Sequence, residues 1–278
     1  MRHARSTQST ERPRVIAVDW SGAAHGAERR IWLAEASPGG QALVRLESGR
    51  DRAALVRHVI EESARTPRLV IGLDFAFALP AWYCYQLGLQ SAADVWARVA
   101  RDGEAWLTAC APPFWGRPGR ARPVLGGSPL RWTERVVPRT AGVGPRSVFQ
   151  VGGAGAVGTG SLRGMPLLHV LVQAGATVWP CQAGGWPLVV EIYPRLLSGP
   201  VVKSRASARA AHLAGAYPAL GGAERRLAIA SEDAFDAAVS ALVMAAWVDD
   251  LARLPPEPDP RLRLEGRIWH PAWRQDPG

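Results

Sequence analysis

The chain has 278 residues, of which 33 are Lys or Arg and 24 are Asp or Glu, so its formal net charge is +9. With 47% hydrophobic and 21% charged residues it can bury a core, which excludes a wholly disordered chain. The length allows one large domain or two small ones. Because basic side chains release counterions when they neutralise phosphates, nucleic acid is an expected partner of so basic a chain.

The cysteines and the apolar runs bear on the compartment. Cys84, Cys110 and Cys181 are far apart and fit no CxxC or Cys/His spacing, which favours a reduced, cytoplasmic setting and gives no support to a zinc site. No apolar run approaches the roughly 18 to 20 residues that cross a bilayer, so no membrane partner is expected. Residues 1–13 are polar, carry arginines and lack an apolar core, and we expect a disordered tail there rather than a signal peptide.

The first part of the chain predicts three antiparallel strands, then a helix, a strand and a second helix. Glycines separate the first three strands, as in a meander. The last strand is almost continuously apolar, which is typical of a strand covered on both faces. Ser91 and Asp94 predict the start of the second helix. The predicted strands are 14–19, 31–36, 42–46 and 69–74, and the first predicted helix is 51–64.

Periodicity disappears at about residues 112–146, which are rich in Arg, Gly and Pro and predict a loop or insertion. The part from Arg117 to Arg146 holds seven arginines and one glutamate, and therefore a net charge of +6. We expect these arginines to contact nucleic acid. They are Arg117, Arg120, Arg122, Arg131, Arg135, Arg139 and Arg146.

Regular structure returns at residue 147 and predicts alternating helices and strands. The predicted helices are 161–174 and 231–251, and the predicted strands are 177–181 and 188–193. The order of elements favours one α/β domain over residues 14–254, built on a mixed sheet flanked by helices. The prolines after residue 254 favour a Pro-rich C-terminal tail over residues 255–278.

Three of the predicted strands end in an acid, namely Asp19, Asp74 and Glu191. A carboxylate at the end of a buried strand costs several kcal/mol unless a partner neutralises it. No basic residue lies next to any of the three acids in its strand, and Arg14 stands at the far end of the first strand. A divalent cation shared between them is the simplest partner.

The last predicted helix adds two acids. Asp233 and Asp236 are three residues apart, so they lie on one face of the helix, close to its N-terminus, where the helix dipole favours negative charge. Small residues continue that face and let the helix approach a sheet closely. They are Ala237, Ser240 and Ala241.

These motifs resemble a known family. They are Val-Asp19-Trp-Ser-Gly, Ile-Gly-Leu-Asp74-Phe-Ala-Phe-Ala-Leu-Pro80, Val-Glu191-Ile-Tyr-Pro194, Asp233-Ala-Phe-Asp236-Ala and Glu265-Gly-Arg-Ile-Trp269. In this order they resemble the domain of unknown function 429 family, which is regarded as predicted nucleases of the ribonuclease-H-like fold. The last helix is similar to that of Holliday-junction resolvases. The long Arg-rich insertion and Phe235 depart from the commoner family pattern.

The resemblance implies a ribonuclease-H-like domain, in which the first and fourth strands are neighbours and the last helix packs across them. It implies a metal-dependent nuclease or phosphodiesterase with two Mg²⁺ or Mn²⁺ ions, which prefer oxygen ligands. Asp19 would bridge the ions, and Asp74 and Asp236 would each hold one. Glu191 or Asp233 would complete a ligand shell or orient a water molecule.

A glycine-rich turn follows the insertion. Gly153, Gly155 and Gly158 match G-x-G-x-x-G, but no acid follows at the distance that a dinucleotide site requires. The three glycines and Ser161 are instead candidates to bind a phosphate through backbone N–H groups at the start of a helix. A tight strand-to-helix crossover would explain the same glycines.

Two other functions stay open. One is a nucleotide-binding or ATP-handling protein of the actin and sugar-kinase group, in which strand-end acids hold Mg²⁺ and nucleotide. The other is a non-catalytic module that binds nucleic acid through the Arg-rich segment. The sequence leaves DNA, RNA and small nucleotides undecided as substrates, and the oligomeric state open.

Overall fold

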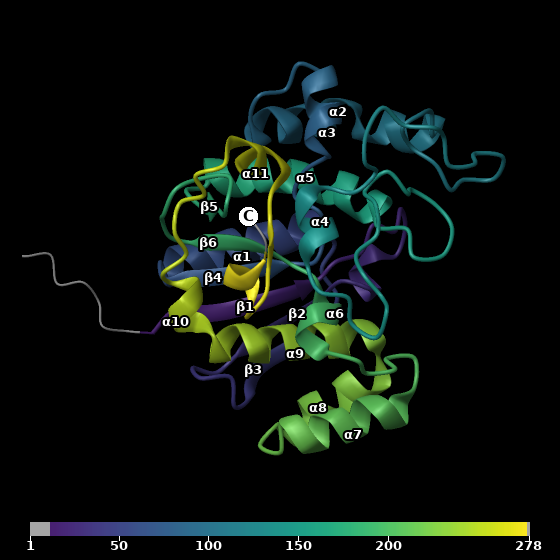
Figure 1. Ribbon diagram of the computed structural model, residues 1–278. Coiled ribbons are helices and arrows are strands. Elements are labelled where there is room, and N and C mark those ends of the chain that lie inside the picture. Colours follow the sequence, from purple (N-terminus) through teal and green to yellow (C-terminus); the bar gives the residue numbers. More distant parts are fainter. Residues whose placement is uncertain (1–11, 277–278) are drawn as a thin grey trace, which may run out of the picture.

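A single mixed sheet runs through the molecule, and helices cover both of its faces (Figure 1). The computed structural model describes residues 12–276. The strands are β1 (Arg14–Asp19), β2 (Trp32–Ala36), β3 (Leu43–Glu47), β4 (Leu69–Leu73), β5 (Thr177–Val178), β6 (Leu188–Ile192) and β7 (Ile268–Trp269). Their order is β3-β2-β1-β4-β6-β5, and β7 pairs with β6. β1 to β3 form an antiparallel meander and the other pairs are parallel, which confirms the predicted mixed sheet.

Helix α9 lies along one face of the sheet against β1, β2 and β3, and α7 and α8 lie beyond it (Figure 1). α1 and α5 lie on the other face, and α3 packs on α5. The α-helices are α1 (Arg52–Arg65), α2 (Ala81–Gln86), α3 (Ala92–Ala109), α4 (Trp132–Val136), α5 (Gly158–Gln173), α6 (Pro194–Ser198), α7 (Ala206–Ala216), α8 (Gly222–Ala230), α9 (Glu232–Ala246), α10 (Val248–Leu251) and α11 (Pro260–Glu265). Within residues 12–276, none of the helices combines the length and the apolar character needed to cross a membrane.

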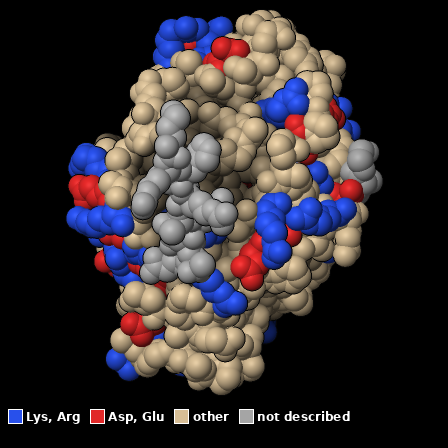
Figure 2. Space-filling view, turned by 90° about the vertical axis from the view of Figure 1, so that its left-hand side faces the viewer, with Lys and Arg blue, Asp and Glu red and all other residues tan. Residues whose placement is uncertain are grey.

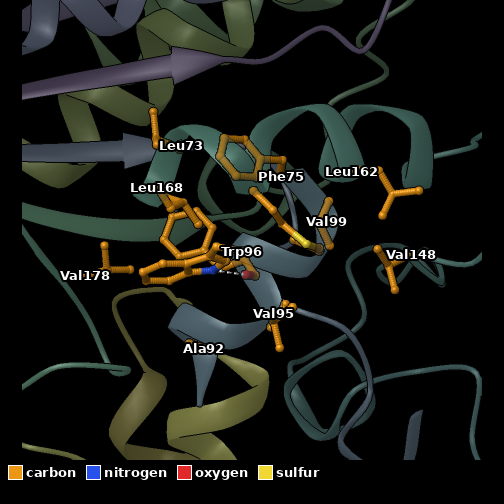
Figure 3. Close-up of a cluster of buried hydrophobic side chains, with 14 of the residues drawn as sticks. Leu73, Phe75, Ala92, Val95, Trp96, Val99, Val148, Leu162, Leu168 and Val178 are labelled. Atoms are coloured by element: carbon orange, nitrogen blue, oxygen red, sulfur yellow. Dashed lines mark hydrogen bonds between the residues drawn. The ribbon is translucent and has the colours of Figure 1, made fainter. Parts of the chain in front are cut away.

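The sheet separates two hydrophobic cores. Along β4, Ile71 belongs to the core beneath α1, α3 and α5, whereas Val70 belongs to the core beneath α9. Figure 3 shows the first core around Trp96, whose indole N–H donates to the carbonyl oxygen of Phe77 at 2.8 Å. Both faces of β4 are therefore covered, as its continuous apolar sequence predicts.

Two predicted helix starts are capped by side chains, and at the second of them these are the predicted Ser91 and Asp94. Asp51 Oδ1 accepts from the backbone N–H of Ala54 at 2.7 Å at the start of α1. At the start of α3, Ser91 Oγ accepts from the N–H of Asp94 at 3.2 Å, and Asp94 Oδ2 accepts from the N–H of Ser91 at 2.9 Å. These caps satisfy N–H groups that have no partner inside the helix, so they fix where each helix begins.

Several predicted bounds differ from the structure. The strand predicted over 177–181 is only β5, because Pro180 has no N–H with which to continue a ladder. The helix predicted over 231–251 is divided into α9 and α10, and the helix predicted over 161–174 begins earlier, at Gly158. The helices between residues 194 and 230 were not predicted.

Residues 112–146 contain only one α-helix, α4, and are otherwise irregular, as predicted for a loop or insertion. Two short bridges join Trp115 to Gln150 and Thr140 to Val143. The segment is nevertheless attached to the body of the protein at α4, where Thr133 Oγ1 accepts from a backbone N–H of β7 at 2.9 Å.

The C-terminal segment packs into the domain, so the prediction of a tail over residues 255–278 is wrong. It forms α11 and then β7, which adds to the sheet beside β6. Trp269 is 0% exposed, and Leu264 and Ile268 are also buried. The prolines at 255–260 end α10 and lead into α11 without ending the fold. The predicted N-terminal tail, residues 1–13, lies almost wholly outside the described residues.

Candidate active site

Asp19 and Asp74 end two neighbouring parallel strands on the same face of the sheet. The register pairs Val18 with Leu73, and the N–H of Asp74 donates to the carbonyl oxygen of Val18 at 3.2 Å. The two acids therefore occupy matching positions. Because side chains alternate along a strand, Asp19 faces the same way as Ala17, toward α9.

Helix α9 brings two further carboxylates to this place. Ser231 caps the helix and accepts from the N–H of Ala234 at 3.2 Å. Asp236 is buried and Asp233, one turn earlier, is half-buried. The small residues predicted to admit a close approach are all buried, namely Ala237, Ser240 and Ala241. We call Asp19, Asp74, Asp233 and Asp236 the acidic cluster.

The carboxyl groups of the acidic cluster hold protons more tightly than isolated ones. Burial raises the pKa of Asp19 well above its ordinary value, and the charges of Asp74 and Asp236 raise it further. Burial and the charge of Asp236 raise the pKa of Asp74 to about 8. Burial also raises the pKa of Asp236 and of Asp233. Such a group of mutually repelling acids takes up either protons or a cation at neutral pH.

One cation already lies in the acidic cluster. Lys203, the only lysine of the chain, donates from Nζ to Oδ2 of Asp236. Burial lowers the pKa of Lys203, but attraction to Asp236, Asp74 and Asp19 together outweighs burial, so the pKa is raised and the ammonium group stays charged. Its charge also lowers the pKa of Asp19 and Asp74, and thus offsets part of the repulsion between the acids.

The loop that carries Lys203 is fixed by two arginines. Buried Arg209, on α7, donates to the carbonyl oxygen of Lys203 and, from Nε at 3.0 Å, to that of Ile229. Arg195, on α6, donates to the carbonyl oxygen of Val201 at 2.6 Å. The backbone on both sides of the lysine is thereby held, which aims the ammonium group at Asp236.

Glu191 lies apart from the acidic cluster. It is paired in register with Leu73 and so faces away from α9. Its Oε1 and Oε2 accept from the guanidinium of Arg131 at 2.5 and 2.8 Å, and Oε2 also accepts from the N–H of Phe77 at 2.9 Å. The prediction that a metal neutralises all three strand-end acids is wrong for Glu191, because an arginine 60 residues away in the sequence does so.

Arg131 is 1% exposed, so the prediction that it contacts nucleic acid is wrong. Besides Glu191 it binds Oε1 of Glu134 at 2.9 Å and the carbonyl oxygen of Glu265 at 2.9 Å. A buried guanidinium is tolerated only when carboxylates surround it in this way. Arg131 therefore joins the insertion to β6 and to the C-terminal segment.

The other arginines of the insertion are exposed and stay candidates for contact with nucleic acid. They are Arg117, Arg120, Arg122, Arg135, Arg139 and Arg146. On the face drawn in Figure 2, basic and acidic groups lie beside one another in separate small patches. That face therefore presents no continuous basic field.

The glycine-rich turn before α5 is mainly a packing element. A Cβ on Gly158 would lie 2.1 Å from the carbonyl oxygen of Val148, so no larger residue fits there. Ser161 is fully buried, and its Oγ accepts from a backbone N–H. The backbone N–H groups of both residues already donate to the carbonyl oxygens of Gln150 and Val157, so the predicted phosphate contact is wrong for these two residues. Gly153 and Gly155 lie in an exposed turn ahead of the helix.

A pocket of about 430 Å³ opens beside Asp74, where the carboxyl ends of β4 and β6 meet the first turn of α5. Asp74 and Glu191 form part of its wall. Further side chains that line it are Trp20, Arg30, Arg146 and Tyr193. The pocket gives a small molecule direct access to one edge of the acidic cluster.

The loop after β1 lies directly against the start of α5. A Cβ on Gly22 would be 2.4 Å from the backbone nitrogen of Gly160. The indole N–H of Trp20 donates to the carbonyl oxygen of Gly160 at 3.0 Å, and its ring contacts that of Phe75 at a centroid distance of 4.9 Å. Two walls of the pocket are thus joined by backbone contact.

Asp19, Asp74 and Asp236 offer only oxygen donors, which suit Mg²⁺ and Mn²⁺. Oδ1 of Asp236 is buried and has no hydrogen-bond partner in the described part of the chain, so it is free for a cation. Within residues 12–276, however, no three or more His, Cys, Asp or Glu side chains are grouped as a ready metal site. The donor chemistry therefore fits a hard metal cation. Such an ion would displace the ammonium group of Lys203 or bind beside it.

Sequence reasoning missed Lys203, Arg30 and Tyr193. Lys203 is a lone lysine among many arginines, and this was the one available signal for it. Its contact with Asp236 depends on the loop between α6 and α7, which has no periodic pattern. Tyr193 belongs to the Glu-x-Tyr-Pro motif, but only the glutamate was considered.

No family model, curated protein or solved structure matches the chain. The function proposed below accordingly rests on the geometry and charge of the acidic cluster.

Proposed function

We propose that the chain is a metal-dependent phosphodiesterase of the nuclease class, with a ribonuclease-H-like fold. The observation that carries the proposal is the acidic cluster, in which burial raises the pKa of Asp19, Asp74 and Asp236, and the charge of Asp236 raises the pKa of the other two further. Perturbed carboxyl groups beside a pocket are typical of functional sites, because a structural role alone seldom requires repelling charges.

The arrangement of elements supports the same fold. β1 and β4 are neighbours, and α9 packs across them, as the resemblance to the domain of unknown function 429 family implies. The acids that match the family's motifs at Asp19 and Asp74 are the ones that lie together. This agreement joins the sequence pattern to one place in the molecule.

Asp19, Asp74 and Asp236 would hold Mg²⁺ or Mn²⁺, two ions in the form that the resemblance implies. When bound, such ions supply an activated water molecule and stabilise the leaving oxygen of a phosphodiester. Asp233 lies one turn from Asp236 and would orient water or a ligand. The ammonium group of Lys203 would stabilise the negative charge of Asp236 and of an incoming phosphate.

Glu191 has a supporting part in this proposal. With Arg131 it forms a buried ion pair in the pocket wall, which fixes β6 relative to the insertion. The exposed arginines of the insertion would attract nucleic acid toward the pocket through charge.

The test is cleavage of labelled single-stranded and duplex DNA and RNA in Mn²⁺ and in Mg²⁺. We expect cleavage of at least one substrate by the wild-type protein, and its loss in Asp19→Asn and in chelator. Asp249→Asn is the matched control, since Asp249 is an exposed acid outside the acidic cluster, and this variant should retain full activity.

Cleavage that survives both chelator and Asp19→Asn would contradict the proposal. Salt-sensitive binding of nucleic acid that ignores metal and Asp19→Asn, without cleavage, would favour the non-catalytic module. Stabilisation by ATP without cleavage would favour the nucleotide-handling alternative.

A further inference from the structure

Two arginines line the pocket beside Asp74 without direct contact to any carboxylate of the described residues. Arg30 and Arg146 both line the pocket and are exposed. Neither forms an ion pair or donates a side-chain hydrogen bond within residues 12–276. Arg131, in the same wall, differs because Glu134 and Glu191 neutralise it.

These two arginines come from different segments that line the pocket, Arg30 from the turn before β2 and Arg146 from the insertion. The charge of Arg30 opposes the rise in the pKa of Asp233, so Arg30 lies near the start of α9. Arg146 lies near Tyr193, whose pKa its charge lowers, and close to Gly155. Guanidinium groups bind phosphate oxygens with paired hydrogen bonds, so both are suited to an anionic ligand.

The rest of the pocket wall consists of aromatic side chains and of backbone. The half-buried ring of Trp20 is held by its hydrogen bond to Gly160 and by contact with Phe75, and it presents a fixed apolar surface. Tyr193 adds a second aromatic ring. The first turn of α5, a helix of 16 residues, brings its positive end to the same pocket. Aromatic surfaces of this kind stack on bases regardless of sequence.

The volume limits what enters. A pocket of about 430 Å³ is within the range of roughly 300 to 1,000 Å³ that holds a single small molecule. A duplex cannot place several base pairs in such a space. One nucleotide can, with its base on an aromatic wall and its phosphate between the arginines.

We propose that this pocket binds a single nucleotide unit, with the phosphate held by Arg30 and Arg146 and the base or sugar against Trp20. Resting on the function proposed above, this makes the substrate a free nucleotide ester or the end of a single strand, and not the interior of a duplex. The shared chemistry of both sources is one phosphate joined to one nucleoside.

The experiment measures binding by calorimetry in chelator, where no cleavage occurs. The probes are adenosine 5′-monophosphate and a short single-stranded oligonucleotide. We expect at least one of them to bind, and Arg30→Gln and Arg146→Gln each to weaken binding about tenfold, as for the loss of one charge-assisted contact. Tighter binding of the mononucleotide identifies a free nucleotide as the ligand, and tighter binding of the oligonucleotide identifies a strand end.

Arg57→Gln is the control, because Arg57 is an exposed arginine on α1, outside the insertion, that does not line the pocket, and it should leave binding unchanged. Binding of neither probe, or binding that both pocket variants leave intact, overturns the inference. Asp19→Asn should keep nucleotide binding while it loses cleavage, so the two proposals fail separately. Cleavage of closed circular duplex DNA by a protein that binds neither probe would retain the proposed function and exclude this substrate class.

Discussion

Lys203 donates a hydrogen bond to Asp236 from a loop that joins two helices, and thereby places the chain's only lysine among four carboxyl groups. Arg209 holds the carbonyl oxygen of the same lysine. A positive charge fixed in this way compensates the acidic cluster in the absence of metal. Removal of this charge should therefore lower the stability of the folded protein.

Lys203→Met keeps most of the side-chain volume and removes the charge. At pH 8 in chelator we expect it to lower the free energy of unfolding by about 3 kcal/mol, because one partner of a largely buried pair is left alone. Urea denaturation measures this. Mg²⁺ should restore part of the loss, and the double variant Lys203→Met with Asp236→Asn should be more stable than Lys203→Met. A single variant as stable as the wild type would show that Lys203 does not compensate the acids.

The pKa of Asp74 predicts how stability depends on pH. An acid whose pKa is higher in the folded than in the unfolded chain binds more protons when folded, so its contribution to stability falls as pH rises. For Asp74 this interval runs from its ordinary value of 3.8 to about 8. Relative to Asp74→Asn, the wild type in chelator should lose stability across this interval.

Denaturation of both proteins at several pH values checks this difference. Asp94→Asn provides a comparison of opposite sign, because the hydrogen bond from Ser91 lowers the pKa of Asp94. Equal pH dependence of the wild type and Asp74→Asn would mean that Asp74 is not crowded by other acids.

Arg131 should matter for stability and not for affinity. Arg131→Met leaves Glu134 and Glu191 buried without their partner, and we expect a loss of about 3 to 5 kcal/mol in the free energy of unfolding. Arg135→Met, on the surface a turn away, should change stability by less than about 0.5 kcal/mol. If Arg131→Met has a normal melting temperature but binds nucleic acid more weakly, Arg131 contacts nucleic acid, as predicted for the arginines of the insertion.

Trp269 tests whether the C-terminal segment belongs to the core. Trp269→Ala should cost about 3 to 5 kcal/mol, as expected for loss of a large buried ring. Trp247 is 46% exposed, and Trp247→Ala should cost much less. Thermal denaturation of the two variants compares them directly, and equal, small effects would indicate that residues near 269 detach in solution.

The strands could be predicted because their signal is local. Continuous apolar runs ending in Asp19 and Asp74 indicate buried strands, and two parallel strands side by side bring such ends together. The small residues of α9 indicated that it approaches a sheet closely, whereas its place across β1 and β4 was implied by the family resemblance. Each of these features is visible within a window of a few residues.

Glu191 and Arg131 show what a local pattern cannot predict. Whether an acid at a strand end needs a metal depends on which residues the rest of the chain brings near it, and Arg131 comes from a segment with no periodicity. The face on which Glu191 lies depends on the register with Leu73, where a shift by one residue would reverse it. Lys203 escaped prediction for the same reason, since its loop lies between helices that the sequence did not reveal.

The contact between Gly22 and Gly160 fixes the width of the pocket. A single methyl group at residue 22 would act as a wedge between the loop after β1 and the first turn of α5, because the nearest atoms are backbone and cannot rotate away. The charged residues around the opening can be exchanged one at a time, whereas the contact between Gly22 and Gly160 leaves no room for a larger side chain. Inherited variation and deliberate redesign should thus be able to alter what the pocket attracts far more easily than how wide it is.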